Sequence, residues 1–159
     1  MNNKLYEKII SERDVNTLLD LDNDKKENFL IYLMYNRLCN IPFEEMNHSQ
    51  RTLYLAMKLE DACQADSLTS LAEEKDVFLA LSEMKSAFEE LGAVKTADLL
   101  GELILIVPEN TVPEWSWFDE NADLIERLDG DISDYPDGLM KNFYLKYISE
   151  KDIAEEVLK

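Results

Sequence analysis

The chain has 159 residues, of which 34 are Asp or Glu and 16 are Lys or Arg, so its formal net charge at pH 7 is −18. This charge excludes a surface that binds nucleic acid or an anionic membrane directly, and it favours a basic partner. Hydrophobic residues make up 46% of the chain, which is too many for a disordered acidic tail. We therefore predict one folded domain spanning residues 1–159.

Apolar residues recur at helical spacing from the first residues onward. Asp14 and Asp22 precede two of these patterns and are predicted to cap the helices that follow, while Ser49 is the predicted cap of another. Asp66 or Ser67 could cap a short segment containing Leu68 and Leu71. The helices predicted in this half lie around Leu5–Ile10, Val15–Leu21, from Asp22 to before Pro42, and from Ser49 through Cys63.

The second half of the chain continues the same pattern. One long helix is predicted near Glu74–Leu91, with Gly92 as its C-terminal residue, followed by a helix over Ala93–Val107 that Pro108 ends. Pro113 is predicted in the first turn of a short helix, and Asp137 as the cap of the closing helices. Turns are predicted at Asp129–Asp131 and Tyr135–Gly138. No strand is predicted, and the expected fold is all-α, with about eight to ten helices.

Little in the sequence suggests catalysis. The only histidine, His48, is predicted to be an exposed loop residue, and the chain lacks phosphate-loop, zinc-protease and nucleophile-elbow motifs. Two segments that begin like calcium loops, at Asp20 and Asp129, lack the required Gly and Glu. Cys39 and Cys63 are predicted to be buried, reduced thiols. We predict no enzyme activity, cofactor or metal. With neither an apolar leader nor a membrane-spanning run, the expected location is cytoplasmic.

The strongest signal is a concentration of acids. Between Asp98 and Asp137 there are twelve carboxylates and one cation, Arg127, a net charge of −11 over forty residues. B-DNA carries about one charge per 1.7 Å of its axis, so eleven charges match roughly five or six base pairs. Acids three or four residues apart share a helix face and approximate a row of phosphates. We predict that a partner is contacted by these acids, with a tryptophan as anchor: Asp98, Glu102, Glu114, Trp115, Trp117, Asp119, Glu120, Asp123, Glu126, Asp129, Asp131, Asp134 and Asp137.

One stretch resembles a known family. The segment Ala87–Pro108 contains Leu91-Gly92-Ala93 at a helix junction, then Ala97-Asp98-Leu99-Leu100, then a closing proline. In this it resembles the bacterial DNA-mimic protein domain family, which is acidic and all-helical, and the resemblance extends over residues 52–149. The chain departs from the family pattern at Asp66-Ser67, where relatives often have two glycines. The resemblance implies an acidic face that occupies the DNA-binding surface of a transcription regulator, with no catalytic residues.

Three functions remain open at this point. The first is an acidic protein-interaction module, in which the cluster binds a basic protein such as a DNA-binding regulator and thereby mimics DNA. The second is a generic helical adaptor, in which acidity serves only solubility and binding uses an apolar groove. The third is a metal-dependent hydrolase, which requires converging carboxylates in a pocket. The sequence does not specify the partner or the oligomeric state.

Overall fold

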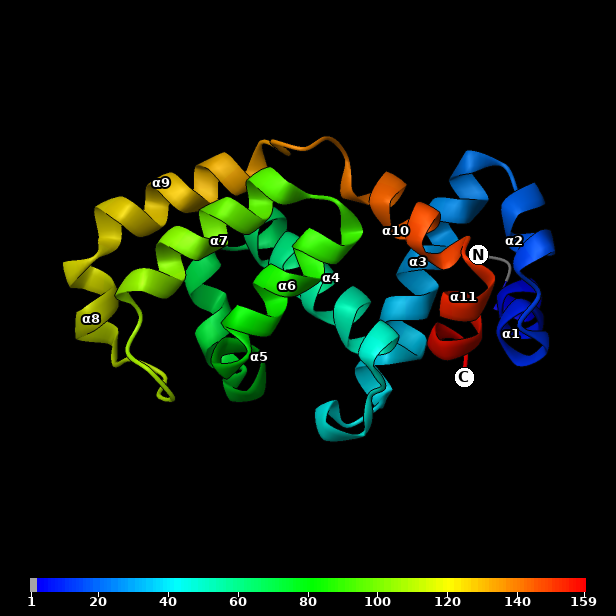
Figure 1. The fold of residues 1–159 in the computed structure, drawn as a ribbon, viewed down its shortest axis with the longest axis horizontal. Helices are drawn as coiled ribbons and strands as arrows, with labels where there is room; N and C mark the ends of the chain where they lie inside the picture. The colour runs from blue at the N-terminus through cyan, green and yellow to red at the C-terminus, as the bar shows by residue number, and fades with distance from the viewer. Residues whose placement is uncertain (1–2) are drawn as a thin grey trace. The chain divides into compact units, whose positions relative to one another are not determined.

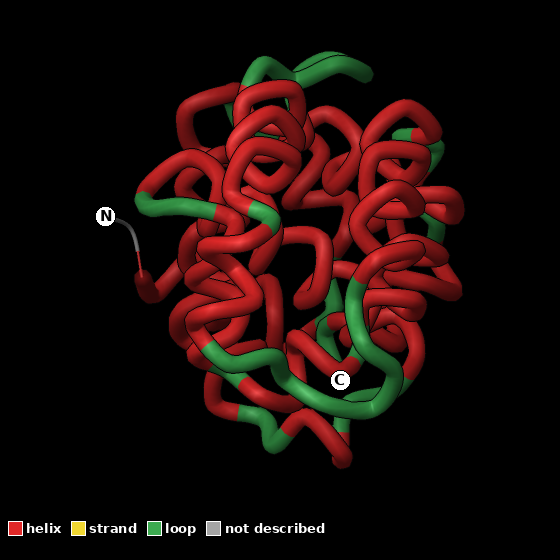
Figure 2. The backbone as a smooth tube through the Cα atoms, turned by 90° about the vertical axis from the view of Figure 1, so that its left-hand side faces the viewer, coloured by secondary structure: helices red, strands yellow, loops and turns green. Residues whose placement is uncertain are grey.

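The computed structural model describes residues 3–159, which form eleven α-helices and three short 3₁₀-helices, designated η. Figure 2 shows helices joined by loops, with no strand among these residues. The prediction of an all-α fold is confirmed, with one α-helix more than the upper end of the expected range. The contacts divide the chain into two compact units. Unit 1 contains residues 3–54 and 141–159, and unit 2 contains residues 55–140. A single domain over residues 1–159 stays a prediction.

Unit 1 is built around the ring of Tyr6, which lies 5.7 Å from Phe29 and 5.6 Å from Tyr32 between ring centroids. The predicted caps are confirmed: Asp14 accepts a hydrogen bond from the Thr17 amide (3.0 Å), and Asp22 accepts one from Lys25 (2.9 Å). The helices of this unit are α1 (Asn3–Glu12), α2 (Val15–Asp20), α3 (Asn23–Asn36), η1 (Leu38–Asn40), η2 (Phe43–Glu45), the start of α4 (His48–Ala65), α10 (Met140–Ile148) and α11 (Lys151–Val157).

Two details of unit 1 differ from the sequence-based expectation. The prediction that Ser49 caps α4 was wrong, because Asn47 does so. The Asn47 side chain accepts from the Gln50 amide (2.9 Å), and the Gln50 side chain accepts from the Asn47 amide (3.1 Å), which satisfies two helix-end donors at once. His48 is exposed as expected but lies in the first turn of α4 rather than in a loop. The helix expected to run to Pro42 ends at Asn36 and is followed by η1.

Unit 2 is a set of short helices packed on a long central hairpin (Figure 1). Helices α6 and α7 form the hairpin, and Gly92 joins them with φ of 91°, a left-handed conformation that favours glycine. The Ala93 amide then donates to the Phe88 carbonyl (2.8 Å), which closes the end of α6. The elements of this unit are the rest of α4, η3 (Leu68–Glu73), α5 (Lys75–Leu79), α6 (Leu81–Leu91), α7 (Val94–Ile106), α8 (Trp115–Glu120) and α9 (Ala122–Ser133).

Three elements of unit 2 differ from the sequence-based expectation. The helix expected over Glu74–Leu91 is two helices separated at Ala80, because α5 packs on η3 while α6 packs on α7. The turn expected at Asp129–Asp131 lies inside α9, where burial of Ile125, Leu128 and Ile132 outweighs the roughly 1 kcal/mol cost of a helical glycine. Pro113 lies just before α8, whose N-cap residue is Glu114.

The departure from the family pattern at Asp66 and Ser67 causes no backbone strain here. Among residues 3–159, the positive φ angles outside glycine belong to Arg13, Asn110 and Tyr135. Ser67 has an extended backbone with φ of −155°. The connection from α4 to η3 in this chain therefore does not require the conformation that a glycine pair would provide.

The two cysteines lie in different environments, and the prediction that both are buried was wrong for Cys39. Cys39 is exposed in η1, whereas Cys63 is buried in α4. Desolvation raises the pKa of the Cys63 thiol strongly, and the neighbouring Asp129 carboxylate raises it further. The thiolate is the reactive form of cysteine. Cys63 is therefore held in its unreactive form at neutral pH.

We expect a thiol reagent to modify one cysteine in the native protein and two in the denatured protein. Mass spectrometry after brief treatment with iodoacetamide at pH 8 should place the native modification on Cys39. Rapid native labelling of Cys63 would contradict its burial. A Cys39→Ser variant provides the control, because it should show almost no native reaction.

Candidate functional site

The negative charge of the chain is concentrated in unit 2. Residues 55–140 contain 21 acidic and five basic residues, a net charge of −16, while the other residues contain 13 acidic and 11 basic residues, a net charge of −2. The two units are of similar size, so the difference is one of composition and not of length. Any electrostatic attraction of a basic molecule is therefore directed mainly at unit 2.

Within unit 2, helices α7 and α9 bring two rows of acids together. The helices run side by side (Figure 1) and are antiparallel, because Glu102 of α7 pairs with Arg127 of α9 while Thr96 contacts Asp137 beyond the end of α9. Each helix buries one apolar stripe and turns the opposite stripe outward. We call the outward acids of these helices the acidic face, and all six are exposed: Asp98, Glu102, Asp123, Glu126, Asp131 and Asp134.

One cation lies in the middle of the acidic face. The Arg127 guanidinium forms ion pairs with Glu102 and with Asp131, the latter at 3.3 Å. Glu102 in particular raises the pKa of Arg127 above its usual value, so the arginine stays charged. A second cation, Lys95, is exposed in the first turn of α7. The other four acids of the face form no ion pair or hydrogen bond through their carboxylates within residues 3–159.

The acidic row of α9 has a length comparable to that of a short piece of DNA. From Asp123 to Asp134 the α9 row advances about 16 Å, at about 1.5 Å per residue. Five base pairs of B-DNA, at about 3.4 Å per phosphate along one strand, have nearly the same length. Packed helices are about 8–10 Å apart between their axes, which sets the separation of the two rows. The arrangement therefore offers two adjacent lines of negative charge.

Besides Glu102 and Asp131, two more of the predicted contact residues are engaged inside unit 2, and both accept hydrogen bonds from backbone amides. Asp129 accepts a hydrogen bond from the Leu68 amide (3.1 Å), which ties α9 to η3. Asp137 accepts bonds from the Lys95 amide (3.0 Å), the Thr96 amide (2.8 Å) and the Thr96 hydroxyl (2.8 Å). Asp137 thus caps α7, and the prediction that it caps the closing helices was wrong. A contact of either carboxylate with a partner stays a prediction.

The remaining predicted residues gather on and beside α8, which directly precedes α9 and contacts it. Trp117 is half-buried and stacks edge-on against Phe118 at 5.1 Å between centroids, while Phe118 lies 6.1 Å from Phe78 in the core. Trp115 is 64% exposed, although its ring also contacts Phe118. Trp115 is therefore the accessible tryptophan of the pair. The acids of this segment are all exposed: Glu114, Asp119 and Glu120.

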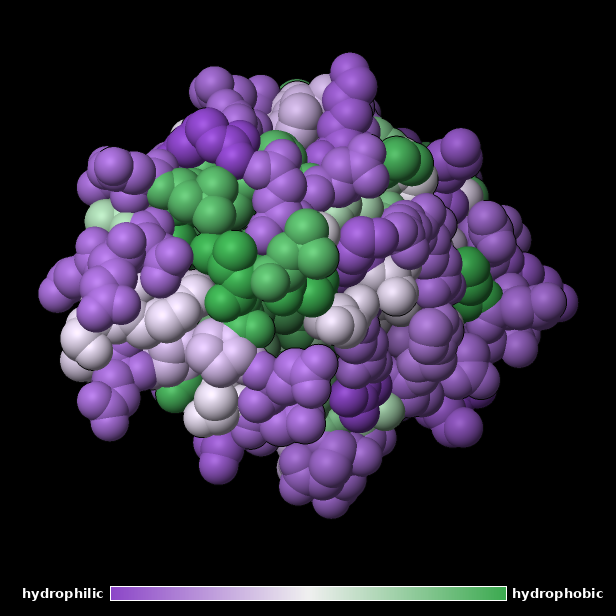
Figure 3. Space-filling view, turned by 60° about the vertical axis from the view of Figure 1, so that its left-hand side comes forward, coloured by the Kyte–Doolittle hydropathy of each residue, from purple (hydrophilic) through white to green (hydrophobic). Residues whose placement is uncertain are grey.

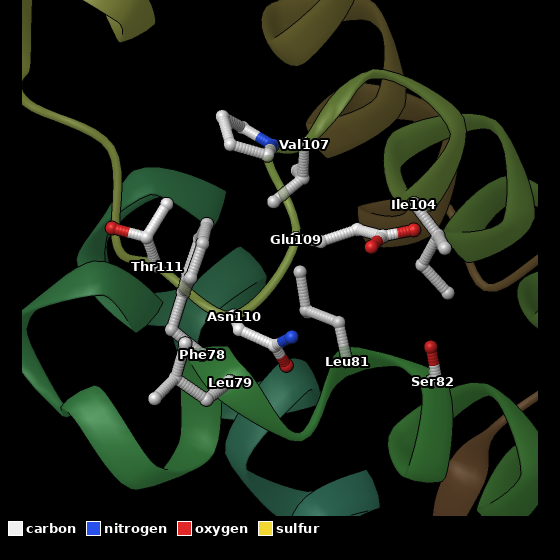
Figure 4. Close-up of a pocket in the computed structure, with 10 residues that line it drawn as sticks. Phe78, Leu79, Leu81, Ser82, Ile104, Val107, Glu109, Asn110 and Thr111 are labelled. Carbon is white, nitrogen blue, oxygen red and sulfur yellow. The ribbon is translucent and has the colours of Figure 1, made fainter.

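Unit 2 contains a groove that was not predicted from the sequence, and both apolar and polar side chains line it. The groove has a volume of about 320 Å³ and lies where the start of α6 faces the end of α7 and the segment that follows it (Figure 4). Leu105, on α7 beside it, is 86% exposed, and Leu79 is 41% exposed. Figure 3 shows hydrophobic side chains gathered in a patch with hydrophilic residues around it. The run Leu103–Val107 was the sequence feature that could have indicated this groove. Five consecutive apolar residues cannot all lie on the one buried stripe of a helix. The groove is lined in part by Phe78, Leu81, Ile104, Val107 and Glu109.

In the part of the chain that the structure describes, potential metal ligands are not brought together. Within residues 3–159, no group of three or more His, Cys, Asp or Glu side chains is placed to hold a metal ion. Asp129 and Asp131, which begin one of the calcium-like segments, lie on a helix and point in different directions from it. Nor does this part of the chain contain a helix with the length and apolar character needed to cross a membrane.

Comparison with known proteins relates most of the chain to one family. The model of the family described as DMP19-like protein matches residues 44–151, which include all of unit 2. A search of curated proteins and a search of solved structures found no match. The match covers the stretch that contains the helix junction at Gly92 and the closing Pro108.

Proposed function

This chain belongs to the DMP19-like family, and from that premise we propose that it is an acidic, non-enzymatic protein-interaction module. In this proposal the acidic face of α7 and α9 binds a basic protein. The partner is a DNA-binding regulator whose DNA-binding surface the acidic face occupies, so that the protein acts as a DNA mimic. The observation that carries the proposal is the pair of acidic rows, four of whose carboxylates have no partner within residues 3–159.

Stability alone does not account for these acids. Asp134 lies just after the last turn of α9, which contains no basic residue, and unlike Asp131 it forms no ion pair within residues 3–159. Acids at a helix C-terminus face the negative end of the helix dipole, at a cost of about 0.3–1 kcal/mol each. Crowding like charges adds further repulsion. Residues kept at a cost to folding are reasonable candidates for binding.

A pull-down from host lysate tests this proposal. The immobilised chain should recover basic nucleic-acid-binding proteins at about 0.1 M salt and lose them at about 1 M, because the Debye length falls from about 10 Å to about 3 Å. Duplex DNA added at low salt should displace the recovered proteins. Binding of the same proteins in the presence of saturating duplex DNA would contradict DNA mimicry.

The groove beside α7, whose floor is apolar, supports a second candidate, the helical adaptor. An adaptor would bind a neutral protein through apolar contacts, which salt does not screen. Capture that persists unchanged at about 1 M salt and is insensitive to duplex DNA would favour this alternative. The two candidates therefore give opposite results in the same experiment.

A further inference from the structure

We propose that the apolar part of the groove beside α7 binds an apolar side chain of the same basic partner, so that α7 is contacted on two sides at once. The attraction between the acidic face and the cations of the partner rests on the proposed function. The occupant is an amphipathic helix with leucine-like residues on one face and Lys or Arg on the other. The acidic face would bind the cations, and the groove would hold the apolar anchor.

The walls of the groove come from three parts of unit 2. Phe78 and Leu81 are buried and form its floor, while Ile104 and Val107 are half-buried along α7 and just beyond its end (Figure 4). The volume of about 320 Å³ is at the lower end of the roughly 300–1,000 Å³ found for pockets that hold small ligands. The space therefore suits one or two apolar side chains rather than a large ligand.

The charge at the rim of the groove indicates which charge its occupant carries. Glu109 lines the groove, and Figure 4 shows its side chain extending toward Ile104. Its carboxylate forms no ion pair or hydrogen bond within residues 3–159, and no Lys or Arg lines the groove. An apolar group that enters beside an unpaired carboxylate in a unit of net charge −16 is best accompanied by a cation.

Helix α7 connects the groove to the acidic face. Glu102 lies on the side of the helix that meets Arg127 of α9, and Ile104 lies on the side that meets the start of α6. Leu105 stands between them in the outward stripe and is 86% exposed. Exposed apolar surface bordered by charge is typical of a protein-binding site. A single helix of the partner could therefore contact both sites.

The test uses a fluorescent synthetic helix of Leu and Lys, with Leu at positions i, i+3, i+4 and i+7 and Lys elsewhere. Two matched peptides separate the contribution of the apolar side chains from that of the cations. One has Ala in place of Leu, and the other has Gln in place of Lys. The full-length chain is compared with Ser82→Trp, which fills the groove from an exposed wall position, and with Ser86→Trp, one turn further along α6 and outside the groove. Circular dichroism melts confirm that both variants fold.

We expect Ser82→Trp to weaken binding of the Leu/Lys peptide by about tenfold or more, since burying a leucine-sized side chain contributes at least that much. Ser86→Trp should bind like the unmodified chain, and the Ala/Lys peptide should not distinguish the variants. Equal binding of the Leu/Lys peptide by the two variants would overturn the groove proposal, even if binding stays salt-sensitive. If the Gln-containing peptide binds as tightly as the Lys-containing one, the groove functions but the proposed electrostatic function fails.

Discussion

Neutralising four acids of the acidic face is expected to slow association with a basic partner by about tenfold to a hundredfold at low salt. The variant carries Asp98→Asn, Asp123→Asn, Glu126→Gln and Asp134→Asn. Steering by a charged surface acts mainly on the association rate, and salt screens it. The dissociation rate should change less. Stopped-flow fluorescence with the Leu/Lys peptide measures both rates, and at about 1 M salt the difference between the two chains should largely disappear.

A charge-matched variant gives the control for this result. Asp20, Glu44, Glu45 and Glu155 are exposed acids of unit 1, and their carboxylates form no hydrogen bond or ion pair within residues 3–159. Replacing them by their amides changes the net charge of the chain by the same four charges. This variant should associate nearly as fast as the unmodified chain. If both variants slow equally, overall charge explains the attraction and the acidic face has no special role.

Replacing Asp137 by Ala is expected to destabilise the protein by about 2–3 kcal/mol. The substitution removes the cap of α7, which typically contributes about 1 kcal/mol. It also leaves the hydroxyl of Thr96 without its acceptor, and Thr96 is only 4% exposed. A buried group that loses its partner costs about 1–3 kcal/mol. Thermal denaturation followed by circular dichroism should show a fall in Tm of about 5–10 °C.

The neighbouring acid Asp134 separates this effect from a loss of charge. Asp134 is exposed, and its carboxylate has no partner within residues 3–159. Asp134→Ala removes the same charge three residues away from Asp137 and should leave Tm unchanged or slightly higher, since an acid at the end of α9 is unfavourable. A similar fall in Tm for both variants would show that Asp137 does not act through its hydrogen bonds to α7.

Local signals in the sequence were sufficient for much of the fold. Asp14 and Asp22 cap α2 and α3 as predicted, because a side-chain cap needs only the residue and the two or three that follow it. Gly92 ends α6 for the same reason, since the left-handed conformation is a property of that one position. Spacing of the apolar residues also predicted α7 with Asp98 and Glu102 on one side of it, whereas a turn was expected in the second half of α9.

Contacts between distant segments decided what spacing could not. Asp129 and Asp137 appeared equivalent to the other acids, yet Asp137 caps a helix that begins more than forty residues earlier, and Asp129 binds the amide of Leu68. The break at Ala80 follows from the different partners of α5 and α6, and it leaves the groove beside α7.

By itself the sequence determined that the chain is helical, that it is strongly acidic and that its acids concentrate between Asp98 and Asp137, because helical periodicity and charge are local properties. Only the tertiary structure decided that α7 and α9 lie antiparallel, so that two separate stripes become one face with Arg127 between them. The reason is physical: packing against a common core selects which helices are neighbours, and no local pattern contains that choice.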